Sequence, residues 1–67
     1  MIKNNISEIM KKKKMNITQL SEESSLHRNI ISRLINNKTN GIDFSTMNKL
    51  CKALECQVGD LFIYIEE

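Results

Sequence analysis

Apolar residues recur at helical spacing in residues 28–36, and this regularity limits the conformations open to the segment. At about 100° of rotation per residue, the segment separates into an aliphatic arc and a polar arc. The aliphatic arc holds Ile30, Ile31, Leu34 and Ile35, and the polar arc holds Arg28, Asn29, Ser32, Arg33 and Asn36. The pattern predicts an amphipathic helix that buries its aliphatic side.

Similar spacing predicts helices before this segment. Residues 3–14 place Ile6, Ile9 and Met10 at helical intervals. Asn16 and Gln19 then have the spacing of a capping box, which predicts the start of a second helix. That helix is short, because Ser24 and Ser25 compete for backbone hydrogen bonds and interrupt the pattern.

Two more helices are expected after a loop over residues 37–41. Asp43 is a favourable N-cap for a fourth helix, and its expected core positions are Phe44, Met47, Leu50, Cys51 and Leu54. Residues 58–62 are compatible with a brief fifth helix, and residues 63–67 with either its frayed end or a short extended tail.

Composition agrees with a small helical fold. The 67 residues include no proline and only two glycines, and 40% of them are hydrophobic, which favours one compact helical domain over disorder or a turn-rich sheet protein. Every apolar run is far shorter than the roughly 20 residues that cross a bilayer, so no membrane partner is expected. The start of the chain lacks a signal-peptide pattern, which favours the cytoplasm.

Positive charge is concentrated in the first half of the chain. Residues 11–38 hold seven basic and two acidic residues, a sum of +5, whereas the whole chain has a net charge of +2 and the remainder therefore sums to −3. This asymmetry suggests an anionic partner. Lys11 to Lys14 have a simpler explanation as well, because cations are favoured at the C-terminus of a helix.

The polar arc of residues 28–36 contains both arginines of the chain and no acidic residue. Arginine and asparagine can make bidentate hydrogen bonds to guanine and adenine edges, and serine can donate or accept, so the set suits the major groove of DNA. The alternative is a polar surface in which asparagine is abundant because the whole chain is rich in it. Ile30, at the edge of the aliphatic arc, is expected to be buried rather than to contact a thymine methyl group.

Residues 16–38, NITQLSEESSLHRNIISRLINNK, resemble the helix-turn-helix of the phage repressor and Cro class, the XRE family. The matching positions are Leu20, Leu26, Ile31, Ser32 and Lys38. Residues 42–62 are similar to the fourth and fifth helices of that family. The resemblance implies an all-α, compact five-helix fold of the lambda-repressor type, a single domain over residues 1–67 with its helix-turn-helix at about 16–37.

The same resemblance implies a sequence-specific regulator of transcription, with repression as the expected effect, in the cytoplasm of bacteria or phage-infected cells. The third helix would enter the major groove of double-stranded DNA, and a homodimer would bind a pseudo-palindromic operator. Arg28, Asn29, Ser32 and Arg33 are the implied contacts to base edges. The implied phosphate contacts are His27, Asn36, Asn37, Lys38 and Thr39.

Three positions depart from the family pattern. Ile17 replaces a glutamine that often contacts DNA, so Thr18 or Asn16 would have to substitute. Ser25 replaces the turn glycine, which costs about 1 kcal/mol if the turn is left-handed. His27 replaces the usual serine cap of the third helix.

Other classes of function find little support. The chain has one histidine, no nucleophile beside a base and no glycine-rich phosphate loop, so we expect no catalytic residues, cofactor or small-molecule ligand. Cys51 and Cys56 lack the spacing of a metal site and are expected to be reduced thiols. A protein-interaction module or antitoxin-like subunit with the same fold stays open, because fold does not dictate function. Residues 62–65 provide an apolar patch for a dimer or for the protein's own core.

Overall fold

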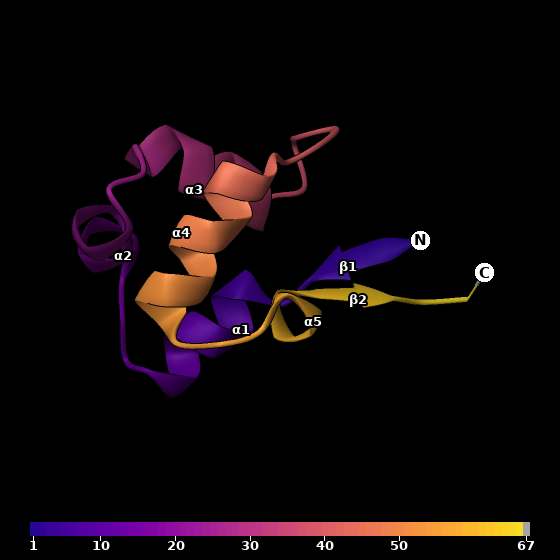
Figure 1. The fold of residues 1–67 in the computed structure, drawn as a ribbon, viewed down its shortest axis with the longest axis horizontal. Coiled ribbons are helices and arrows are strands. Elements are labelled where there is room, and N and C mark those ends of the chain that lie inside the picture. The colour runs from indigo at the N-terminus through magenta and orange to yellow at the C-terminus, as the bar shows by residue number, and fades with distance from the viewer. Residues whose placement is uncertain (67) are drawn as a thin grey trace.

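A computed structural model of the chain describes residues 1–66, which form five helices and a two-stranded sheet (Figure 1). The elements are β1 (Ile2–Asn4), α1 (Ile6–Lys12), α2 (Ile17–Ser24), α3 (Arg28–Ile35), α4 (Phe44–Leu54), α5 (Val58–Leu61) and β2 (Phe62–Tyr64). In Figure 1, α2 lies at the opposite end of the molecule from the sheet, which pairs residues 2–4 with residues 62–64.

The three central helices begin at the residues that the sequence predicts. Asn16 caps α2 in a complete capping box, because its side chain accepts from the Gln19 amide at 2.8 Å and its own amide donates to the Gln19 side chain at 2.9 Å. Asp43 caps α4 by accepting from the Thr46 amide at 2.7 Å. These contacts satisfy amides that have no partner within a helix, which explains why the helices start there.

The sheet joins the two ends of the chain, and it makes the expected all-α fold only approximate. β1 and β2 pair antiparallel, with Ile2 opposite Tyr64, Lys3 opposite Ile63 and Asn4 opposite Phe62. The helix expected at residues 3–14 therefore begins later, at Ile6. Phe62, expected in the fifth helix, is instead the first residue of β2. Of the two options for residues 63–67, the extended one is present at residues 63–64, and residue 67 lies outside the described residues. Strand pairing between residues 2–4 and residues 62–64 therefore replaces the helix that the sequence predicts at the start of residues 3–14.

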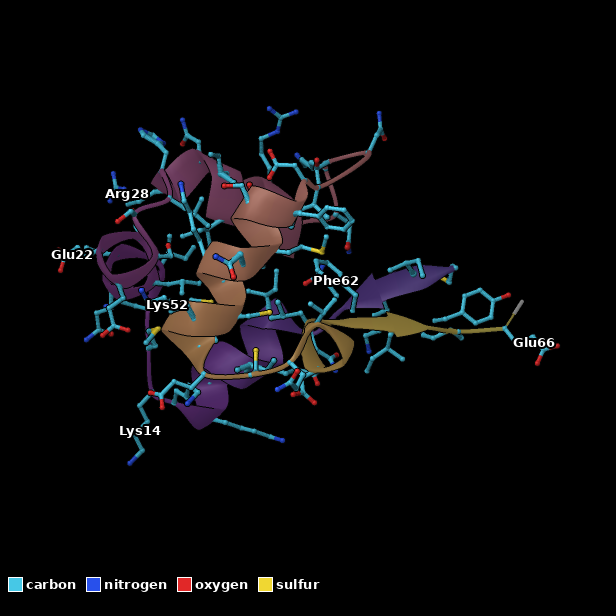
Figure 2. The ribbon with its side chains drawn as sticks, viewed as in Figure 1. Lys14, Glu22, Arg28, Lys52, Phe62 and Glu66 are labelled. Atoms are coloured by element: carbon cyan, nitrogen blue, oxygen red, sulfur yellow. The ribbon has the colours of Figure 1, made fainter. Side chains whose placement is uncertain are left out.

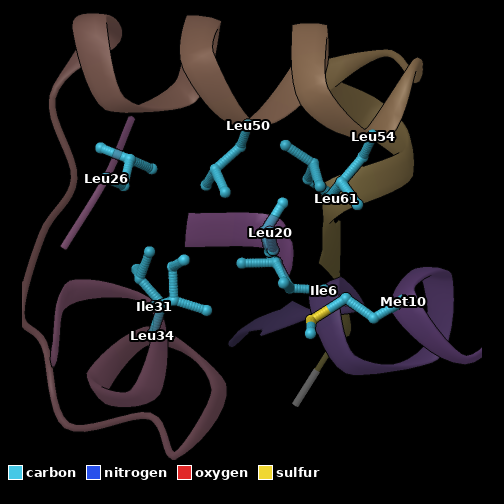
Figure 3. Close-up of a cluster of buried hydrophobic side chains, with 9 residues drawn as sticks. All are labelled: Ile6, Met10, Leu20, Leu26, Ile31, Leu34, Leu50, Leu54 and Leu61. Atoms are coloured by element: carbon cyan, nitrogen blue, oxygen red, sulfur yellow. The ribbon is translucent and has the colours of Figure 1, made fainter. Parts of the chain in front are cut away.

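The core is a cluster of side chains contributed by all five helices and the α2–α3 turn (Figure 3). Its buried members are Ile6, Met10, Leu20, Leu26, Ile31, Leu34, Leu50, Leu54 and Leu61. Phe44 was expected in this cluster, and that expectation is wrong, because 86% of its surface is exposed. Phe44 is the first residue of α4, about 100° around the helix from the buried Leu50 and Leu54, so it points away from the core.

Candidate nucleic-acid interface

A tight turn between α2 and α3 sets the direction of α3. Ser25 has a left-handed backbone with φ 61°, which is the strained conformation that the missing glycine suggested. The buried Ser24 hydroxyl donates to the Leu20 carbonyl at 2.6 Å and accepts from the Leu26 amide at 3.2 Å. The Ser21 hydroxyl donates to the Leu26 carbonyl at 2.6 Å. Two serine side chains thus satisfy backbone groups of the turn.

His27 caps the start of α3 through its ring. Its Nδ1 atom accepts a hydrogen bond from the Asn29 amide at 3.1 Å. Because Nδ1 is the acceptor, the proton of the neutral ring lies on Nε2. The exposed ring therefore keeps one donor for an acceptor outside the protein, as a phosphate contact requires.

Burial divides α3 along the predicted arcs. Ile31 is fully buried and Leu34 is 5% exposed, whereas Arg28, Asn29 and Arg33 are exposed on the other side. Figure 2 shows Arg28 at the outside of the fold, close to the end of α3 that faces α2. Burial therefore confirms the predicted sides of α3 at these positions, whereas Ile30 of the aliphatic arc is 42% exposed.

The two guanidinium groups have no acidic neighbour along the chain, since no aspartate or glutamate occurs between Glu23 and Asp43. Within residues 1–66, neither Arg28 nor Arg33 makes an ion pair or a side-chain hydrogen bond. A guanidinium without an internal partner keeps all five donors for a ligand. This side of α3 is therefore suited to an anionic or hydrogen-bond-accepting surface.

Several other predicted contacts already have partners inside the protein. The Asn36 side chain donates to the Ser32 hydroxyl at 3.4 Å, a long bond that leaves both groups near the exposed side. The Asn37 side-chain oxygen accepts from Asn4 at 2.8 Å, which ties the end of α3 to β1. Thr39 donates to the Gly41 carbonyl at 2.8 Å.

Lys38 is exposed in the same loop, immediately after the end of α3. Thr18 is exposed in the first turn of α2, on a separate element from the other predicted contacts.

The lysine run lies apart from α3. Lys11 and Lys12 form the last turn of α1, where cations are favoured by the helix dipole. In Figure 2, Arg28 lies at the upper left of the fold and Lys14 at the lower left, with α2 between them. The basic first half of the sequence therefore forms two separate groups on the surface, and the arginines of α3 define the candidate site.

Two apolar side chains near this site are exposed where the sequence predicted burial. Ile30 is 42% exposed, and it lies beside Arg33 on a shallow hollow between α3 and the start of α4. Phe44 is exposed one residue beyond the cap of α4. For Ile30, the only sequence signal is its place at the edge of the aliphatic arc.

Two further observations concern metal-binding side chains and the cysteine thiols. Residues 1–66 contain no group of three or more His, Cys, Asp or Glu side chains arranged to hold a metal ion. Burial, followed by the nearby Cys51, raises the pKa of the Cys56 thiol, which disfavours the reactive thiolate. In the same part of the chain, no helix combines the length and apolarity needed to span a bilayer.

Two short helices joined by a tight turn, with polar and basic side chains exposed on the second helix, are the arrangement of the helix-turn-helix class of DNA-binding proteins. Comparison with known families agrees, since residues 5–67 match the model of the Cro/C1-type HTH DNA-binding domain. The chain belongs to this family.

A relative from Bacillus subtilis (strain 168) is similar over most of both chains. It is described as the uncharacterized HTH-type transcriptional regulator YozG, and it is 43% identical over 60 residues. The aligned region covers 90% of this chain and 71% of the relative.

Proposed function

We propose that this protein binds a specific sequence of double-stranded DNA, with α3 in the major groove. The observation that carries this proposal is the exposed side of α3, where Arg28 and Arg33 have no partner among residues 1–66, while Ile31 and Leu34 anchor the opposite side of the helix in the core. In this proposal residues 1–67 act as one domain, and residues 16–37 are its helix-turn-helix.

The proposed contacts fall into two groups. Four side chains of α3 address base edges, and they are Arg28, Asn29, Ser32 and Arg33. The phosphate contacts are His27, Asn36, Asn37, Lys38 and Thr39, with Thr18 reaching the backbone from α2. The Nε2 donor of His27 supports a phosphate contact by that residue. The side-chain oxygen of Asn37 already accepts a hydrogen bond from Asn4, so Asn37 would contact a phosphate through its side-chain NH2 group.

Binding to an operator would let this protein regulate transcription. The similar protein YozG is described as a transcriptional regulator, and a compact domain on an operator can exclude RNA polymerase. Repression in the cytoplasm of a bacterial cell, or a cell infected by a phage, is therefore the effect that we propose.

The proposed operator is pseudo-palindromic and is bound by a homodimer. The protein is 35 Å long, and the sheet lies at one end of that long axis (Figure 1). Two copies that meet end to end at the sheet would have centres about one length apart, which suits half-sites about 34 to 36 Å apart. Exposed apolar residues gather on the sheet, which offers a surface for the second copy, and they are Met1, Ile2, Ile63, Tyr64 and Ile65.

Sedimentation tests the homodimer directly. Tyr64→Lys should shift the protein toward the monomer and weaken binding to a two-half-site duplex. Asn48→Lys, which adds the same charge at an exposed position of α4 outside the sheet, should do neither. A wild-type protein that stays monomeric with and without its preferred duplex contradicts the dimer.

A protein-interaction or antitoxin-like module is the second candidate. The apolar surface of the sheet favours it, because large exposed apolar patches mark contact sites for proteins. The two candidates differ in their response to salt. DNA binding weakens log-linearly with salt, with a slope near −0.9 per neutralised phosphate, whereas an interaction module binds duplex DNA feebly at any salt.

Selection from a randomised duplex library at near-physiological salt tests the function. We expect enrichment of a defined motif and a steep salt dependence of the selected duplex. Failure to enrich any motif, together with feeble binding at low salt, would contradict sequence-specific DNA binding and favour the interaction module.

A further inference from the structure

We propose that Ile30 is a specificity-determining residue that contacts the C5 methyl group of a thymine in the bound DNA. This inference rests on the proposed function of α3 and adds an apolar contact to its polar ones. It concerns a side chain that the helical pattern assigns to the core.

The position of Ile30 suits a contact with a base edge. It is the third residue of α3, and the N-terminal residues of a recognition helix are those that reach the bases. On the helix it lies about 60° from Arg33, which is exposed. A DNA duplex that meets Arg33 therefore also passes close to Ile30.

The core does not need this side chain. Ile31 is fully buried and Leu34 nearly so, and both pack α3 against the other helices. Ile30 leaves 42% of its surface in contact with water, beside a shallow hollow that Thr46 and Ile42 also line. A ligand that covers this surface would remove the apolar area from water, which stabilises the complex.

Thymine is the base that fits an aliphatic side chain. Of the four bases, thymine alone presents an apolar group, its C5 methyl, in the major groove. The other groups on the base edges there are hydrogen-bond donors and acceptors, which need polar partners. Isoleucine placed against the N4 donor of cytosine or the acceptors of guanine would leave those groups without a hydrogen bond. Ile30 therefore favours thymine over cytosine at one position of each half-site.

The test removes the methyl group from the DNA and the side chain from the protein. Starting from the duplex that the randomised library selects, each thymine of one half-site is replaced in turn by uracil, which lacks only the C5 methyl. At one position we expect wild-type binding to weaken about fourfold, the effect of leaving one methyl group unburied. Ile30→Ala should weaken binding to the original duplex by a similar factor and should not respond to uracil there.

Two further variants separate recognition from folding. Ile30→Val keeps a branched apolar side chain and should keep most of the response to uracil. Ile35→Ala removes a half-buried isoleucine from another side of α3, and it should lower the melting temperature while leaving the response to uracil intact.

The outcomes distinguish this inference from the function that it rests on. If the protein binds its selected duplex but no uracil weakens wild-type binding, the inference is overturned and the proposed function stands. The same holds if Ile30→Ala still responds at the same position. If no duplex is selected, both fall.

Discussion

Arg28 and Arg33 are the two arginines of the chain, and both side chains are exposed on α3. We expect Arg28→Ala or Arg33→Ala to cost about 1–3 kcal/mol of binding free energy on the preferred duplex and to relax the preference at one base pair. Lys38→Ala should weaken binding to every sequence equally and lower the salt slope by about one. Titrations of each variant against the selected and a scrambled duplex measure both effects, and equal losses of the arginine variants on all duplexes would refute their assignment to bases.

The left-handed Ser25 is a second test at the scale of one residue. Glycine adopts this conformation without the steric cost of a side chain, so Ser25→Gly should raise the free energy of unfolding by about 1 kcal/mol. Ser24→Gly is the matched control and should lower stability, because the buried Ser24 hydroxyl bonds both Leu20 and Leu26. Urea denaturation separates the two, and a loss of stability in Ser25→Gly would show that the turn needs its serine.

At the scale of an element, the cap of α4 makes stability depend on pH. Hydrogen bonds from the Thr46 hydroxyl and amide hold the pKa of the Asp43 carboxyl below its usual value. The folded state therefore binds the proton less readily than the unfolded state, and the cap contributes fully above the unfolded pKa. Its contribution is lost as the pH falls below about 4 and passes the folded pKa.

Asp43→Asn tests this effect, since asparagine is an equally good cap without an acidic proton. We expect the melting temperature of the wild type to fall more steeply than that of Asp43→Asn between about pH 4 and pH 2. The other carboxylates titrate in both proteins and cancel in the difference. If the melting temperatures of the two proteins fall in parallel with pH, protonation of Asp43 does not weaken the cap of α4.

At the scale of the whole molecule, Asn4 connects the first strand to the end of the proposed recognition helix. Its side chain donates to the Leu34 carbonyl and to the Asn37 side chain, both at 2.8 Å. Asn4→Ala leaves a partly buried carbonyl without this partner, so we expect a loss of about 1 kcal/mol in the free energy of unfolding. Asn40→Ala, at an exposed loop position, should have little effect on urea denaturation. Equal stability of the two variants would show that Asn4 does not secure α3.

The amino-acid sequence alone determined the features that depend on neighbours a few residues apart. The helical spacing predicted α2, α3 and α4, and the caps at Asn16, His27 and Asp43 are confirmed by the structure. A cap bonds an amide two or three residues ahead, and one turn of helix spans fewer than four residues. Caps and helical spacing therefore depend only on short stretches of sequence. The same spacing predicted that Ile31 and Leu34 are buried and that Arg28 and Arg33 are exposed.

Only the tertiary structure decided what happens between distant segments. Ile2 has helical spacing with Ile6, yet residues 2–4 form a strand because they meet residues 62–64 near the other end of the chain. Ile30 and Phe44 are exposed because no other element within residues 1–66 covers the sides of α3 and α4 on which they lie. Whether a side chain is buried depends on how helices pack against one another, which the periodicity of a single helix does not contain.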